Sequence, residues 1–261
     1  MPGFSEYGVG PNLMPHPVAF DHALFVAIAI VSPILDALWF YPRLRRQMAV
    51  GVTGARERFY RLAIATEWVQ VALLFLVWVA CRRPWRGLWL GMGSPRGSAG
   101  GFAVAGIVAG LLWKQHQAVV GRPQRLEMVR RQLASAIPLL PHTGEEMRLF
   151  RGLALTAGIC EEILFRGFML WYISAWTGLI PAALISCVLF GFAHAYLGPS
   201  HVVRSALIGV FLVILVIAGG SLWPAMIVHA AVDLNSGDLW FRAFSASPPQ
   251  GTSGSSAEAA N

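Results

Sequence analysis

Long apolar runs recur along this chain, and most approach the length of about 20 residues that a helix needs to cross a bilayer. Only 13% of the 261 residues are charged, against about 25% in soluble domains. The pattern predicts an all-α fold, a polytopic membrane helix bundle of about seven transmembrane helices. The predicted spans lie near residues 20–41, 62–81, 98–114, 147–176, 180–197, 202–219 and 222–241.

The basic residues indicate how these spans are oriented. The net charge is +7, and 19 of the 20 basic residues are arginines, ten of which lie in the loops 42–61 and 115–146. The positive-inside rule then places these loops in the cytoplasm, the N-terminus outside and the C-terminus inside. We interpret the charge as topology and lipid contact, in a bacterial plasma membrane, and expect no nucleic-acid partner. Arginines in the loop 82–96 conflict with this assignment, and a half-inserted GLWLGMG segment there would make eight spans.

Composition divides the chain into four parts. Residues 1–19 form a lead, and residues 20–142 hold three spans and an amphipathic surface helix near 123–137. Residues 143–241 carry the remaining spans, and residues 242–261 are rich in Ser, Ala, Gly and Pro and predict a disordered tail. Thr143 and Glu146 fit a capping box that starts a helix of more than thirty residues, reaching about Trp176.

Three ionisable residues lie inside that long apolar helix: Glu161, Glu162 and Arg166. Each charge costs roughly 2.5–3.5 kcal/mol at the centre of a membrane span, so such residues are rare and usually functional. Glu162 and Arg166 are four residues apart and are expected to form an ion pair on one helix face. Glu161 points about 100° away and has no partner on its own helix. Glu161 is therefore the candidate for chemistry.

Two later spans add polar residues that can reach the same region. His194 lies one helical turn after Phe190, and His229 lies one turn before Asp233. These residues and Glu161 are expected to converge in the inner half of the bilayer. Asp36 lies near a membrane surface and is expected to extend toward it, whereas Glu67 lies deeper and the sequence offers no explanation for it.

Two kinds of chemistry are open to this set. A carboxylate with imidazoles can activate water by general-base catalysis. Alternatively, Glu161, His194 and His229 could bind zinc, with a second glutamate as the base. Asp233 could then support an oxyanion or orient His229. Either route predicts hydrolysis of a carbonyl compound, and we expect this to be a peptide bond within the membrane. The three cysteines show no paired spacing and are interpreted as packing residues.

Three ordered motifs carry a family resemblance. EEILFR at 161–166 matches EExxxR, FGFAH at 190–194 matches FxxxH, and HAAVD at 229–233 matches HxxxN/D. The chain thereby resembles, over residues 143–241, the CPBP family of CAAX-processing (Rce1-type) endopeptidases and bacterial Abi-type intramembrane proteases. The resemblance implies that residues 143–241 form a catalytic core, without metal or cofactor, that acts on a membrane protein or peptide.

The resemblance also implies residue roles. Glu161, assisted by His194, would activate water, while Glu162, Arg166 and Phe190 would support the site. His229 and Asp233 would bind the substrate carbonyl and the oxyanion. The eukaryotic members carry Asn where this chain has Asp233, and an ionised Asp cannot donate to an oxyanion.

The substrate stays open among a C-terminal sorting signal, a bacteriocin-type peptide and a CAAX-like tail. Two other classes compete with a protease. A non-catalytic membrane adaptor or immunity protein would use the same cavity for binding. A transporter would use Glu161 and His194 as a proton relay, but the sequence shows no inverted repeat of the kind that many transporters have.

Overall fold

The computed structural model describes residues 16–245, and within this range the regular elements are all helical. The predicted all-α class is therefore confirmed. Most of the predicted lead (1–19) and tail (242–261) lies outside the described residues. The predicted start of the tail is wrong, because the last helix continues to Ser245. The reason is packing, since Ala243 is fully buried against the rest of the bundle.

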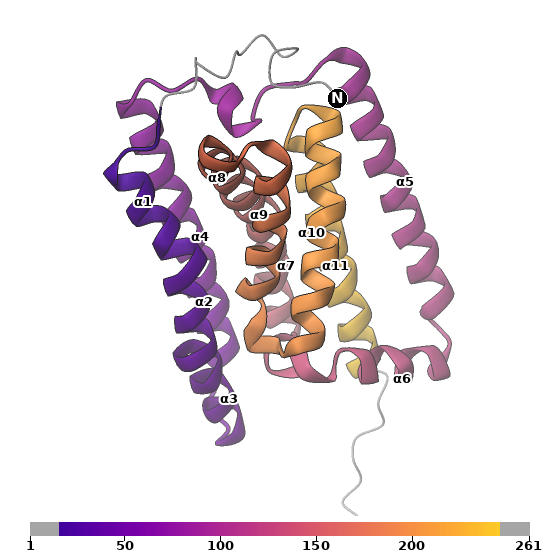
Figure 1. Cartoon of the computed structure of the whole chain (residues 1–261). Helices are drawn as coiled ribbons and strands as arrows, with labels where there is room; N and C mark the ends of the chain where they lie inside the picture. Colours follow the sequence, from indigo (N-terminus) through magenta and orange to yellow (C-terminus); the bar gives the residue numbers. More distant parts are fainter. Residues whose placement is uncertain (1–15, 246–261) are drawn as a thin grey trace, which may run out of the picture.

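Three long helical segments form the N-terminal half. The first is a continuous helix, Ala19–Ala49, made of α1, α2 and α3 with two π-helical segments between them. Helix α4 runs back beside it, and α5 stands on the opposite flank, so that the C-terminal helices lie between them (Figure 1). The bounds are α1 (Ala19–Val26), η2 (Ala27–Val31), α2 (Ser32–Leu35), η3 (Asp36–Phe40), α3 (Tyr41–Ala49), α4 (Ala55–Ala80), η4 (Trp85–Leu88) and α5 (Pro95–Val119).

The C-terminal half forms the centre of the bundle. Helices α7, η6 and α8 form one continuous helix, which confirms the predicted long element. Its start is the predicted capping box, since Glu146 N donates to Thr143 Oγ1 (3.1 Å) and Thr143 N donates to Glu146 Oε2 (3.2 Å). The bounds are α7 (Gly144–Glu161), η6 (Glu162–Met169), α8 (Leu170–Thr177), α9 (Leu179–Ala193), η7 (Ala195–Leu197), α10 (Pro199–Gly219) and α11 (Trp223–Ser245).

A short helix crosses one end of the bundle. Helix α6 (Pro123–Gln132) lies across the end of the bundle where α11 finishes (Figure 1), followed by the 3-10 segment η5 (Ala134–Leu139). Leu126 is buried, as the predicted amphipathic face requires, and Arg130 Nε donates to the Ala243 carbonyl at 2.8 Å. The predicted helix is present, and its α-helical part ends at Gln132 rather than near residue 137.

Four helices in the described part are long and apolar enough to cross a membrane. They are Ala19–Ala49, Ala55–Ala80, Pro95–Val119 and Pro199–Gly219, with mean hydropathy between 1.3 and 2.6 in their most apolar windows. Helix α9 is also apolar but has only 15 residues. These helices indicate an integral membrane protein.

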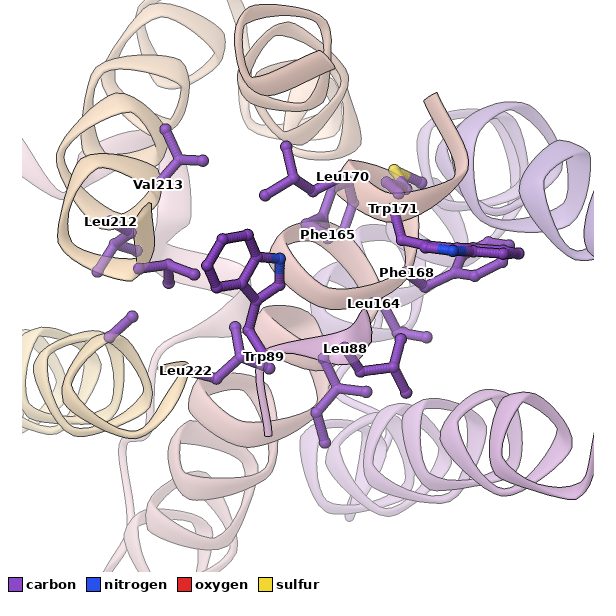
Figure 2. Close-up of a cluster of buried hydrophobic side chains, with 14 of the residues drawn as sticks. Leu88, Trp89, Leu164, Phe165, Phe168, Leu170, Trp171, Leu212, Val213 and Leu222 are labelled. Atoms are coloured by element: carbon purple, nitrogen blue, oxygen red, sulfur yellow. The ribbon is translucent and has the colours of Figure 1, made fainter. Parts of the chain in front are cut away.

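The main apolar core surrounds η6 at the end of the bundle opposite α6. Figure 2 shows Leu88 and Trp89, from the loop between α4 and α5, among side chains of η6, α8 and α10 and beside Leu222, which precedes α11. Leu222 N donates to the Trp89 carbonyl at 2.9 Å and fixes this loop. The GLWLGMG segment thus packs into the core through a four-residue 3-10 helix, which is too short to be an eighth span.

Candidate active site

Glu162 lies at the centre of a buried charged cluster. Its side chain is fully buried, and its Oε1 accepts hydrogen bonds from Arg166 Nη1 and from His229 Nδ1, both at 2.8 Å. The ion pair with Arg166 confirms the prediction from their four-residue spacing. The contact with His229 joins α7–η6 to α11 and was not predicted. An ionised carboxylate can only accept hydrogen bonds, so this contact requires His229 to carry a proton on Nδ1. The other ring nitrogen, Nε2, then points away from Glu162.

The nitrogen Nε2 of His229 faces two further carboxylates. Glu161 Oε2 lies 3.7 Å from it, and Asp233 Oδ2 lies 3.6 Å from it. Both distances exceed a direct hydrogen bond and suit a bridging oxygen atom from water or a carbonyl group. Glu161 Oε2 is buried and has no hydrogen-bond partner among the described residues. The structure therefore groups Glu161, His229 and Asp233, as the sequence predicted.

Phe190 connects the two histidines. Its ring centroid lies 4.9 Å from that of His194 and 5.8 Å from that of His229, and the Arg166 guanidinium carbon lies 4.1 Å from it. His194 caps the end of α9, and its Nδ1 lies 2.9 Å from the Phe190 carbonyl oxygen. A carbonyl can only accept, so Nδ1 carries a proton and donates.

His194 is placed near the group but is not bonded to Glu161. It lies within electrostatic range of Asp233, and the two described side chains of Glu161 and His194 form no hydrogen bond or ion pair. Among the described side chains, the ion pair of Glu161 is with His229, at 3.7 Å.

The backbone brings these residues together in two ways. Helix α7 gives way to a π-helical segment at Glu162, and such segments are frequent at functional sites. Ser186 Oγ of α9 donates to the Phe165 carbonyl of this segment at 2.9 Å. Helices α7 and α11 cross closely at Gly158, where a Cβ atom would lie 2.7 Å from both the Cβ and the backbone nitrogen of Ala230. Ala230 follows His229, so this crossing sets the position of the imidazole.

Two carboxylates from the N-terminal half also reach the site. Glu67 of α4 lies within electrostatic range of Glu161, His229 and Asp233, and its Oε2 is buried without a hydrogen-bond partner among the described residues. Asp36 begins the π-helical segment η3 and lies within electrostatic range of Glu161 and His194. In the sequence, Glu67 and Asp36 can be recognised as candidate site residues because each is an acidic residue inside an apolar run.

The zinc alternative requires Glu161, His194 and His229 to lie together around one ion. Among the residues that the structure describes, no three His, Cys, Asp or Glu side chains form a group that could hold a metal ion. The set Glu161, His194 and His229 is therefore not assembled as a metal site here.

Comparison with known proteins places this cluster in a family context. Residues 144–235 match the family described as type II CAAX prenyl endopeptidase Rce1-like. The matched range runs from the start of α7 to Asn235 in α11 and includes every residue of the cluster that comes from the C-terminal half. Searches of the curated proteins and of the solved structures find no match. The family match confirms the resemblance to the CPBP and CAAX proteases that the three motifs predict.

Proposed function

We propose that this protein hydrolyses a peptide bond in a membrane-associated protein or peptide. The proposal starts from the match of residues 144–235 to the Rce1-like endopeptidase family. The observation that carries this proposal is the position of His229. Glu162 holds one of its ring nitrogens, and Glu161 and Asp233 flank the other at 3.7 and 3.6 Å. This is the geometry of a general base beside an oxyanion-binding group.

The proposed reaction uses Glu161 as the general base. Glu161 takes a proton from a water molecule as that water attacks the substrate carbonyl carbon. The resulting oxyanion is stabilised by Nε2–H of His229 in its doubly protonated form and by Asp233 when that side chain is protonated. Collapse of the tetrahedral intermediate breaks the C–N bond, and Glu161 returns the proton to the leaving amine. The products are a carboxylic acid and an amine.

His194 has a supporting role in this proposal. Its Nδ1–H is engaged by the Phe190 carbonyl, which leaves Nε2 as a hydrogen-bond acceptor. An acceptor on the site side of α9 can orient the attacking water toward the carbonyl carbon. In this role His194 acts on Glu161 through the water molecule, so the two side chains need no direct contact.

We also propose that the bundle crosses the membrane seven times. The seven passes would be Ala19–Ala49, α4, α5, the continuous helix α7–α8, α9, α10 and α11. Their up-and-down order and the arginines near α6 support an outside N-terminus and a cytoplasmic C-terminus. A plasma membrane of a bacterium is the proposed location.

The test is cleavage by the purified protein in proteoliposomes. A library of C-terminal membrane anchors, bacteriocin-type peptides and CAAX-like tails with and without a prenyl group is presented, and the products are identified by mass spectrometry. We expect one class to be cut at a single peptide bond, and the cleavage to persist in the presence of a strong chelator. Peptides that bind without being cut would favour the adaptor, and loss of activity on chelation would favour zinc.

A further inference from the structure

A groove outside the candidate active site is formed by α5, α7 and α11. It has a volume of about 570 Å³, and α5 forms one wall at the flank of the bundle (Figure 1). A neighbouring pocket of about 390 Å³ shares Arg151, Asp238 and Arg242 with it. The lining residues from α11 are Ala231, Leu234, Asn235, Asp238 and Arg242.

This groove and the candidate active site lie on different faces of α11. Asp238 follows His229 by nine residues, which is about two and a half helical turns. His229 therefore points toward Glu162 while Asp238 points to roughly the opposite side of the helix. The groove is a separate feature and has no part in the proposed reaction.

One end of the groove carries a surplus of positive charge. A single carboxylate, Asp238, faces Arg242 Nε (2.7 Å), Arg151 Nη2 (3.5 Å) and His116 Nε2 (3.4 Å). One carboxylate cannot neutralise two guanidinium groups. Arg151 and Arg242 remain 54% and 49% exposed, so they keep N–H donors for another anion. Phosphate groups match this fork geometry well.

The other end of the groove is apolar. Its walls are Ala109, Leu112, Trp113, Leu155, Ala231 and Leu234, and the Trp113 side chain is 66% exposed. On each of the three helices the polar residues lie closer to α6 than the apolar ones do, because α5 ends, α7 begins and α11 ends at that side. An anionic head toward α6 and an apolar chain toward the middle of the bundle would match both ends.

We propose that this groove binds an anionic phospholipid from the membrane leaflet on the α6 side. The phosphate group is held by Arg151 and Arg242, with His116 beside it, and one acyl chain lies along Leu112, Trp113 and Leu155. Basic pockets between membrane helices hold lipid head groups in this manner. The proposal is independent of the proposed peptidase activity.

The test uses Trp113 as a reporter of the acyl chain. The full-length protein is reconstituted with phosphatidylglycerol whose chains are brominated, since bromine quenches tryptophan on contact. The part of the quenching that is lost in Trp113→Phe belongs to the groove. We expect this part to be several-fold greater with brominated phosphatidylglycerol than with brominated phosphatidylcholine at the same mole fraction. Equal quenching by both lipids would overturn the proposal.

The charged end is tested with a matched pair of variants. Arg151→Gln/Arg242→Gln should weaken quenching of Trp113 by phosphatidylglycerol, with an apparent affinity lower by roughly tenfold or more. Arg122→Gln/Arg148→Gln removes two charges from the same end of the bundle outside the groove and should leave it unchanged. If the first variant fails to fold, Arg151→Gln alone provides the same comparison. Equal effects of the two pairs, or displacement of the lipid by soluble glycerol phosphate, would contradict a phospholipid site.

Discussion

Nδ1 of His229 lies 2.8 Å from Oε1 of Glu162, and that same oxygen accepts a hydrogen bond from Arg166 at 2.8 Å. The second glutamate of the pair therefore has two partners on two helices, whereas Glu161 has no hydrogen-bond partner among the described residues. In the proposed reaction, Glu162 positions His229 and Glu161 is the base. The proposal thus gives the Glu161–Glu162 pair one structural and one chemical member.

Removing the Glu162 carboxylate is expected to lower both stability and activity. Glu162→Gln leaves the Arg166 guanidinium buried without a counter-charge, and breaking a buried pair in this way costs about 3–5 kcal/mol. The double variant Glu162→Gln/Arg166→Met removes both charges and should regain much of the lost stability. It should not regain activity, because His229 still lacks its carboxylate. Thermal unfolding and peptide cleavage, measured on both variants, check this. Full recovery of cleavage in the double variant would refute the positioning role.

Substitutions of Asp233 test whether this side chain donates a hydrogen bond to the oxyanion. In the proposed reaction a protonated Asp233 donates a hydrogen bond, and an Asn side chain can donate in its place. Asp233→Asn should therefore stay active, and its cleavage rate should no longer depend on protonation of residue 233. Asp233→Leu should lose activity by about 10²–10³-fold. Cleavage rates of the two variants across pH decide the matter. Activity in the Leu variant equal to that of the parent would show that Asp233 has no such role.

The close crossing of α7 and α11 should be sensitive to a single methyl group. Gly158→Ala places a Cβ atom 2.7 Å from Ala230, so the two helices must move apart and His229 must shift relative to Glu162. We expect Gly158→Ala to cleave peptide more slowly than the parent even at temperatures where the variant remains folded. Gly106→Ala is the control, because a Cβ atom there meets nothing within 4 Å. If both variants cleave like the parent, the crossing does not control the geometry of the site.

His142, in the loop before α7, should make stability depend on pH. Its burial and the nearby Arg56 guanidinium lower the pKa of His142 from 6.5 to about 4. Between these values the unfolded chain binds a proton that the folded chain does not, so the folded state loses stability as the pH falls through this window.

His142→Phe tests this dependence. The phenyl ring should keep the stacking on Phe244, whose centroid lies 4.1 Å from that of the imidazole, and it carries no titrating group. The melting temperature of the variant should therefore fall less than that of the parent between pH values above 6.5 and near 4. An identical fall in both proteins would contradict the assignment to His142.

Sequence reasoning succeeded where the determining interactions are local. The capping box of Thr143 and Glu146 needs only a three-residue spacing, and the Glu162–Arg166 pair needs only one helical turn. The long helix followed from an unbroken apolar pattern. The approach of Glu161 to His229 followed from comparing the depths of separate spans, whereas the same comparison also predicted a contact of Glu161 with His194 that the described side chains do not make.

The sequence could not fix how the helices are rotated about their axes. The contact between His229 and Glu162 depends on the rotation of α11 against α7, which the Gly158–Ala230 crossing sets. The inward positions of Glu67 and Asp36 depend on the same kind of rotation in the N-terminal half. Periodicity gives the relative angles within one helix, but it does not say which neighbour each face meets.

The rate of peptide cleavage by Glu161→Gln in proteoliposomes tests the central claim most directly. Gln keeps the size of the side chain and removes its ability to take a proton from water. The control is Glu145→Gln, an exposed carboxylate at the start of the same helix. The proposed role predicts a rate lower by about 10²–10⁴-fold for Glu161→Gln and an unchanged rate for Glu145→Gln. A folded Glu161→Gln protein that cleaves as fast as the parent would contradict it.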